Sequence, residues 1–460
     1  IGTPGGQEGM IFNAQDSDER EMRTLDITFQ GDATDRTELE DQDGNIEGAI
    51  IYGDLVITRD AGHTDEEDLF GTLTLRSEGP GDSNAITGDI TSQSGGLSGD
   101  SDNNLLDIEI IADSAFDVGG SIIFNSEVEA QDEATLTVSG AEPITVANVN
   151  TTASTQTIDT VNIVNDGADL TFTGASASGT FGDGTENLVM SGSGSITFGT
   201  AEDVEDFADG IDGGADLSSI DASGFAGPLS IETVTNVDVN LFSFTAGTGE
   251  TSVNFRDITI DDDGDVETPS GWNLDFSGAA AGSEVRISGS NTFTDGSLNI
   301  DLGANTTLYI DADTDWTDLD LSIIQGQPIV LADDVTLTLT AAQASGLNII
   351  AGPDTDANPG YNGQVVIEDL GDYPDTNENG DNDDTAELID YDFSGILVPA
   401  SAMLADDDVT LSEASNLGNI SINLYALSND NETLAGQSIR FSHQEQANGR
   451  VINVVDGGTP

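Results

Sequence analysis

Short runs in which apolar residues alternate with polar ones recur along most of this chain, and they limit the fold more than any other feature. A period of two is what half-buried β-strands require. Gly, Asp, Asn and Ser separate the runs and supply turns. Helical patterns are confined to one or two turns at 204–207 and 341–344. The sequence therefore predicts an all-β chain.

The spacing of the runs fits two β architectures. Between Leu298 and Leu339 a run begins about every ten residues, as in a β-solenoid whose coils bury their inward residues on one another. A β-sandwich of hairpins has a similar rhythm, but the Asn-Gly and Asp-Gly dipeptides lie mostly in acidic loops rather than between paired runs. We therefore expect an elongated body of β-solenoid-like parallel coils, with β-sandwich modules joined by acidic loops as the alternative or as an addition.

Composition divides the chain into four expected segments. An N-terminal β domain with acidic loops covers 1–130 and holds five of the nine arginines. A Thr/Gly-rich β repeat region covers 131–235, and a second β repeat region covers 236–400 and ends in an acidic calcium-loop segment. A small β module covers 401–460. The two tryptophans, Trp272 and Trp316, are expected to contribute to the core.

Charge excludes several classes of partner. The chain has 87 acidic residues against nine basic ones, all of them arginine, and its formal net charge is −78. Such a chain repels phosphate, so it is not expected to bind nucleic acid or an anionic membrane surface. It contains no cysteine and no apolar run long enough to insert into a membrane. Disorder is disfavoured because the apolar residues arrive in β-branched clusters.

The clearest candidate metal site is an acidic loop at 375–387. Its first six residues follow the calcium-loop pattern D-x-[DN]-x-[DN]-G, with Gly380 at position six. Alternate side chains of such a turn converge on Ca²⁺, which takes about six to eight oxygen ligands. Position twelve is Ala386, and an acid follows one residue late. The expected ligands are Asp375, Asn377, Asn379, Asp381, Asp383 and Glu387.

Weaker calcium candidates show the same alternation of acids and amides. They are Asp41, Asp43 and Asn45; Asp100, Asp102 and Asn104; Asp261, Asp263 and Asp265; and Asp311, Asp313 and Asp315. Dense carboxylates repel one another in a compact state, and divalent ions that relieve this repulsion would couple ion binding to folding. The alternative is a salt-adapted protein whose acids are solvated and bind no specific metal.

Enzymatic motifs are missing from the sequence. It has no GxSxG elbow, HExxH pair or P-loop. The two histidines, His63 and His443, are far apart and lie in polar contexts, where a solvated side chain is more common than a general base. With so many acids, a pair of carboxylates that could hydrolyse glycosides is uninformative. We therefore expect no enzymatic activity.

One segment resembles a known family. The stretch 210–216 (GIDGGAD) is similar to a glycine-aspartate calcium-roll repeat, and 217–231 (LSSIDASGFAGPLSI) resembles a repeat of bacterial surface-layer and RTX-type (repeats-in-toxin) exported proteins. The stretches 335–349 and 391–396 look like repeats of large acidic surface proteins. The resemblance implies an exported, calcium-dependent, β-rich protein that forms a lattice, fibre or adhesin. Asp212, Gly213, Gly214 and Asp216 match its glycine-aspartate pattern.

These observations predict an extracellular structural protein of the cell surface. We expect it to bind calcium through acidic loops and to self-associate into a surface layer or filament, with residues 1–12 as a candidate arm that adds a strand to a neighbour. The expected partners are further copies of the chain and cell-surface polysaccharide, without nucleic acid or membrane insertion. The alternative is a carbohydrate-binding adhesin or a polysaccharide-active β-helix enzyme.

Overall fold

The protein is built almost entirely of β-strands. The computed structural model describes residues 10–14, 24–30, 49–59, 72–79, 84–94, 105–124, 133–151, 158–174, 185–199, 210–214, 216–235, 237–238, 241–260, 271–293, 296–322, 327–352, 363–368, 395–397, 400–403, 409–411, 421–426, 439–441 and 452–456. The chain forms two compact units. Unit 1 comprises 1–255 and 273–283, and unit 2 comprises 256–272 and 284–460.

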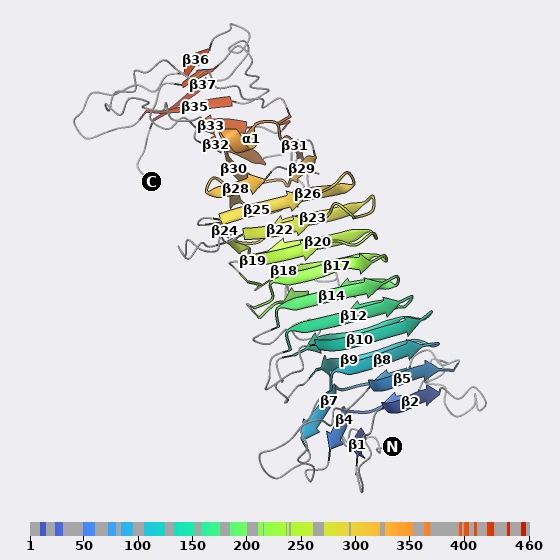
Figure 1. Cartoon of the computed structure of the whole chain (residues 1–460). Helices are drawn as coiled ribbons and strands as arrows, with labels where there is room; N and C mark the ends of the chain where they lie inside the picture. The colour runs from blue at the N-terminus through green and yellow to red at the C-terminus, as the bar shows by residue number, and fades with distance from the viewer. Residues whose placement is uncertain are drawn as a thin grey trace, which may run out of the picture. The chain divides into compact units, whose positions relative to one another are not determined.

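Unit 1 consists of parallel coils, each of which adds one strand to each of two sheets (Figure 1). Sheet A runs in the order β1 (Met10–Ala14), β4 (Leu55–Arg59), β7 (Ile90–Ser94), β9 (Phe116–Ile123), β11 (Ile144–Asn150), β13 (Asp169–Phe172), β15 (Ser195–Phe198), β18 (Leu229–Thr235) and β20 (Thr251–Arg256). The short strands β3 (Ile50–Ile51), β6 (Asn84–Ile86) and β16 (Ile211–Asp212) pair at its margins.

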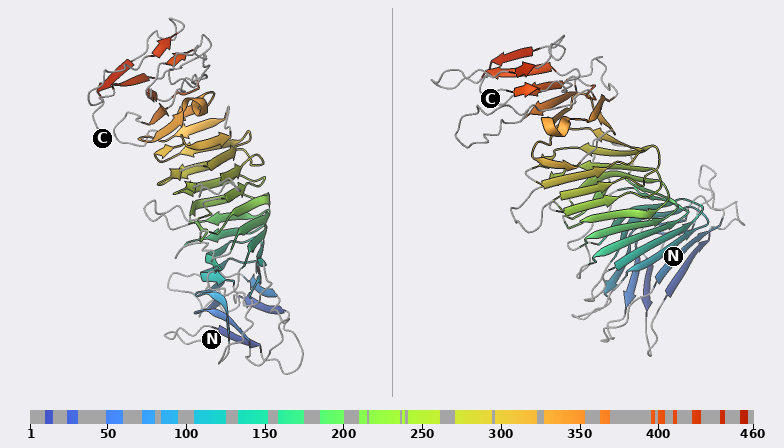
Figure 2. Two further views of the ribbon diagram at one scale, coloured as in Figure 1. Left: turned by 60° about the vertical axis from the view of Figure 1, so that its left-hand side comes forward. Right: turned by 45° about the horizontal axis from the view of Figure 1, so that its top comes forward.

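Sheet B of unit 1 has the same parallel arrangement (Figure 2). It runs in the order β2 (Thr24–Gln30), β5 (Thr72–Glu78), β8 (Asp107–Ala112), β10 (Glu133–Gly140), β12 (Thr160–Asp166), β14 (Asn187–Gly192), β17 (Ser219–Phe225), β19 (Leu241–Thr245) and β22 (Gly271–Asp275).

The core of unit 1 is formed by apolar side chains that stack from coil to coil. In sheet B, Leu136 lies in register between Ile108 and Ile163, and all three side chains are almost fully buried. In sheet A, Phe172 stacks on Phe198 with their ring centroids 4.6 Å apart. Most strands bury every second residue, as in β10, β12 and β14, and burial of apolar side chains contributes roughly 1.5–3 kcal/mol per large residue. The stacking explains why strands this short are stable only together.

Unit 2 continues the same kind of architecture within its own residues. β26 (Thr306–Ile310) pairs with β29 (Pro328–Leu331), which pairs with β31 (Asn348–Ala351). The other parallel pairings join β25 (Gly296–Asp301) to β28 (Leu319–Ser322), β21 (Thr259–Ile260) to β24 (Thr292–Phe293), and β34 (Val409–Leu411) to β36 (Ile439–Phe441). A further sheet runs in the order β27 (Thr314–Asp315), β30 (Thr336–Thr340), β32 (Gln364–Glu368), β33 (Ala400–Met403), β35 (Ser421–Ala426) and β37 (Ile452–Asp456). β23 (Ser283–Ser288) also lies mostly in unit 2.

One helix, α1 (Ala341–Ala344), occurs in the described residues of unit 2. It begins with a capping box in which Thr340 and Gln343 bond to each other's backbone N–H groups. The Gln343 amide also donates to the carbonyl oxygens of Trp316 and Leu319, at 2.8 and 2.7 Å. The predicted helical turn at 341–344 is therefore confirmed, whereas 204–207 lies outside the described residues. In the described part of the chain, no helix combines the length and apolar character needed to cross a bilayer.

The strand pairs within each unit are parallel, which confirms the prediction of solenoid-like coils and not the alternative of antiparallel sandwich modules. Both tryptophans are buried, as expected: Trp272 is 3% exposed and Trp316 is fully buried. The four compositional segments with edges at residues 130, 235 and 400 stay a prediction.

Candidate functional site

Most of the expected calcium ligands fall on residues that the structure does not describe. Those outside the described residues are Asp375, Asn377, Asn379, Asp381, Asp383 and Glu387; Asp261, Asp263 and Asp265; Asp41, Asp43 and Asn45; and Asp100, Asp102 and Asn104. His63, His443 and most of the candidate arm at 1–12 also lie outside them. Among the predicted ligands, the structure describes Asp311, Asp313, Asp315, Asp212 and Asp216.

The three acids at 311, 313 and 315 each have a different partner within unit 2. An Oδ of Asp311 accepts a hydrogen bond from Arg286 at 2.9 Å. Asp313 accepts from the backbone N–H of Thr336 at 2.7 Å, on the following coil. Asp315 accepts from both the backbone N–H and the hydroxyl of Thr317. The structure thus directs these carboxylates toward protein donors rather than toward one common point.

Asp212 accepts a 3.2 Å hydrogen bond from the backbone N–H of Gly214, which has a φ of +63°. Asp216 lies exposed just beyond this turn. Within the described ranges, no three His, Asp or Glu side chains gather closely enough to hold a metal ion. The calcium prediction therefore depends on the acidic loops outside the described residues, of which 375–387 has the clearest pattern.

A recurring turn, Asp-x-Ser, Asp-x-Thr or Asp-x-Gly, explains many of the aspartates. The carboxylate accepts the backbone N–H two residues ahead, as in Asp221 to Ser223 and Asp275 to Ser277, both at 2.8 Å. Asp301 accepts from the N–H of Gly303 in the same way. Such turns let short acidic side chains satisfy backbone donors where a strand ends or, at Asp221, where the pairing of β17 with β14 is irregular.

Other aspartates link one coil to the next. Asp54 accepts the backbone N–H of Asp89 at 3.0 Å, and Asp89 in turn accepts that of Ser121 at 2.7 Å. The residue before each donor is a glycine, Gly88 or Gly120, on which a Cβ would overlap the accepting carboxylate. These charge-assisted bonds fasten successive corners of unit 1 to one another. The signal in the sequence is an Asp followed one coil later by Gly-Asp or Gly-Ser.

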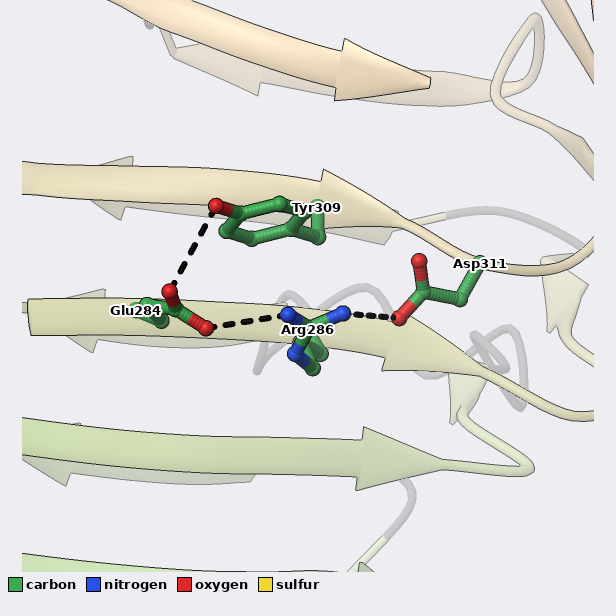
Figure 3. Close-up of polar contacts among 4 residues, drawn as sticks. All are labelled: Glu284, Arg286, Tyr309 and Asp311. Atoms are coloured by element: carbon green, nitrogen blue, oxygen red, sulfur yellow. Dashed lines mark hydrogen bonds and ion pairs between the residues drawn. The ribbon is translucent and has the colours of Figure 1, made fainter. Parts of the chain in front are cut away.

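A charged cluster stands on the outward surface of unit 2, on β23 and β26 and just beyond (Figure 3). The Arg286 guanidinium lies 3.0 Å from a carboxylate oxygen of Glu284 and 2.9 Å from one of Asp311. Its Cζ lies 4.1 Å from the ring centroid of Tyr309. The Tyr309 hydroxyl donates to Glu284 at 3.4 Å. The guanidinium, the two carboxylates and the phenol hydroxyl each have a polar partner within this cluster.

The pKa values in this cluster follow from its charges. Partial burial lowers the pKa of Arg286, but hydrogen bonds to Asp311 and Glu284 and their negative charges outweigh that effect, so its pKa is raised. Partial burial and the nearby charge of Glu284 raise the pKa of Tyr309. Arg286 therefore stays protonated and clamps two coils. Sequence reasoning did not single it out, although a cation in a chain with nine basic residues is a usable signal.

From β10 to β19, the outward surface of sheet B in unit 1 carries few charged side chains. Its strands present Thr, Ser, Asn and Val side chains that are half-buried between the fully buried ones. Asp221 is the one carboxylate within these rows, and Glu133 and Asp166 lie at the ends of their strands. We call this surface the neutral face; it comprises Thr135, Thr137, Ser139, Thr160, Asn162, Val164, Asn187, Val189, Ser191, Ser219, Ser243 and Thr245.

Sheet A of unit 1 carries a similar but narrower surface. The hydroxyl side chains of one residue per coil stand in register from β11 to β20. This column contains Thr145, Thr171, Thr197, Ser230 and Ser252. It ends at Asp117, whose pKa is raised by burial.

Comparison with known proteins adds no relatives. The chain matches no protein-family model, no curated protein and no solved structure. The surface-layer and RTX-type resemblance stays a hypothesis based on the residues quoted for it, and the functional argument depends on the geometry above.

Proposed function

We propose that this protein is a non-enzymatic, extracellular structural protein of the cell surface. In this proposal the coils form a rigid body, copies of the chain associate into a layer or filament, and calcium bound by acidic loops reduces the repulsion between them. The observation that carries the proposal is the pair of continuous parallel sheets whose outward faces bear short side chains in register, in a chain with a net charge of −78.

The negative charge of the chain is the reason to propose that calcium stabilises the fold and the assembly. Like charges destabilise both a compact fold and an assembly. Many described aspartates accept hydrogen bonds from backbone donors, but these neutral donors do not offset the net charge of the chain. A divalent ion that binds only the native state stabilises it by about 2.7 kcal/mol per site at a hundredfold excess over its Kd. The 375–387 loop supports the proposal because it has the densest set of oxygen ligands in the sequence.

The test is thermal unfolding and negative-stain electron microscopy of the full chain with millimolar calcium, with a chelator, and with the chelator plus molar NaCl. We expect the chelator to lower the melting temperature by several degrees and to remove layers or filaments. NaCl should not replace calcium. Equal melting curves with and without the chelator would refute structural calcium, and recovery by NaCl alone would favour general salt adaptation.

A matched pair of variants tests whether the 375–387 loop is responsible for the calcium response. Replacing both Asp375→Asn and Asp381→Asn should abolish most of the calcium response. Asp166→Asn, at an exposed strand end outside the loop, should leave it unchanged. Binding of the calcium-loaded wild type to a polysaccharide in a glycan array, without assembly, would support the adhesin instead. Release of reducing sugar from acidic polysaccharides would support an enzyme.

A further inference from the structure

The neutral face differs in charge from the rest of the same sheet. The outward positions of β2, β5 and β8 carry Asp26, Arg76, Asp107 and Glu109. In the next rows, Asp107 is followed by Thr135 and Asn162, and Glu109 is followed by Thr137 and Val164. The change from charged to uncharged residues occurs at one coil. The outward residues of β10, β12 and β14 are therefore uncharged between the strand ends, in a chain with 87 acids.

The side chains of the neutral face repeat with the spacing of the strands. Thr137, Val164 and Ser191 form one column in register, and Thr135, Asn162 and Val189 form the next. Neighbouring strands of a sheet are roughly 4.7–4.9 Å apart. A second copy of this face carries the same repeat, so in an aligned sheet-on-sheet packing rows of short side chains face rows of equal spacing.

Electrostatics favours contact between copies at this surface. Two chains of −78 repel strongly, and screening at physiological salt acts only beyond about 8 Å. Contact through a surface with few carboxylates therefore costs less than contact through the acidic coils. Apolar area is also available, since Leu241 on β19 is 63% exposed next to the neutral face. Val164 and Val189 add apolar side chains within it.

From these observations we infer that the neutral face is the surface through which a second copy of the chain packs, sheet against sheet. The inference rests on the proposed self-assembly and names its contact. Five strands about 4.8 Å apart and about 20 Å long cover roughly 500 Å² per copy. About 1,000 Å² in total is near the lower limit of a specific interface. A single contact is therefore weak, and repetition in an assembly strengthens it.

The test places charge inside the neutral face of the full chain. The double variant Thr137→Asp and Asn162→Asp buries two carboxylates per copy in any contact that includes these residues, which is unfavourable without a partner charge. Sedimentation velocity in calcium should show association weakened at least tenfold. Thr28→Asp makes the same change outside the face, at an exposed position paired with Arg76, and should associate like the wild type. Thr137→Asn, which stays uncharged, should also retain association.

The outcomes separate the inference from the proposed function. A wild type that stays monomeric in calcium overturns both. A wild type that assembles, together with a folded double variant that assembles equally well, overturns the inference alone. Circular dichroism verifies that the double variant is folded. If it assembles normally but loses binding to an insoluble polysaccharide, the neutral face binds glycan and the inference is wrong.

Discussion

The two units use similar parallel coils, but they differ in the charges on their outward strands and in the residues that adopt positive φ. In unit 1 the outward positions of β10, β12 and β14 between the strand ends are uncharged columns, whereas unit 2 places Arg286 between two carboxylates. In unit 1 every described residue with positive φ is a glycine, whereas unit 2 also uses Asp257 and Asp334, at φ of 54° and 59°. Asp tolerates this region better than most residues.

The difference shows that one coil geometry accepts two solutions to the same electrostatic problem. On β10, β12 and β14, unit 1 avoids contacts between like charges by placing neutral side chains in its columns. Unit 2 keeps them together by surrounding one cation with acids. In unit 2, Asp257 contributes to a corner in two ways. Its backbone adopts a positive φ, and its carboxylate accepts the N–H of Ser290 at 2.6 Å. Three substitutions test this comparison.

The largest effect is expected at a corner of unit 1. Gly192 has a φ of +107°, and a Cβ there would overlap the backbone oxygen of Asn165 on the preceding coil. Gly192→Ala should therefore lower the free energy of unfolding by about 2–3 kcal/mol, measured by urea denaturation followed by circular dichroism. Gly224→Ala is the control, because the atoms nearest to its Cβ would be the Ser191 Cβ at 3.3 Å and the Met190 backbone oxygen at 3.6 Å, neither of which it would overlap. Equal losses in both variants would contradict the importance of the corner geometry.

A smaller effect is expected when the cation of unit 2 is removed. Arg286→Met leaves Glu284 and Asp311 without their shared countercharge, and it removes the contact with Tyr309. Two partly exposed ion pairs and a cation–π contact together contribute about 1–2 kcal/mol. The melting temperature should fall most at low salt. Arg256→Met, which loses its ion pair with the adjacent Asp257, should change stability less. An identical response in both variants would show that the cluster adds nothing.

The smallest effect is a stabilisation, at the acidic end of sheet B in unit 1. Burial raises the pKa of Asp107 above its ordinary value of 3.8. The folded state therefore binds this proton more tightly than the unfolded state, so stability falls as pH rises through the interval between the two pKa values. Asp107→Asn should raise the melting temperature slightly at pH 7, and the gain should vanish below pH 3.8. A gain that persists at low pH would exclude the carboxylate charge as its cause.

Local sequence patterns predicted much of the strand content. The runs between Leu298 and Leu339 correspond to β25, β26, β28, β29 and β30. Alternation also predicted which residues are buried, as in Thr336–Thr340, where Leu337 and Leu339 face inward. The helical turn of α1 was expected from Ala341–Ala344. These features depend on contacts between near neighbours, so a single segment contains the information.

The roles of the polar residues were less predictable. The alternating acids at 311, 313 and 315 suggested one calcium site, yet Arg286 and Thr336, which bind two of them, lie about 25 residues away in the sequence. The neutral face was not visible either, because its columns combine residues from Thr135 to Thr245 that become neighbours only in the correct register.

The sequence by itself determined a negatively charged, all-β chain of short strands, because charge and alternation are local properties of the residues. Only the tertiary structure decided which coil lies in register with which, and hence which carboxylates meet a donor and which outward columns are uncharged. That register is set by the stacking of buried side chains such as Leu136 and Phe172 across many coils, and no single strand specifies it.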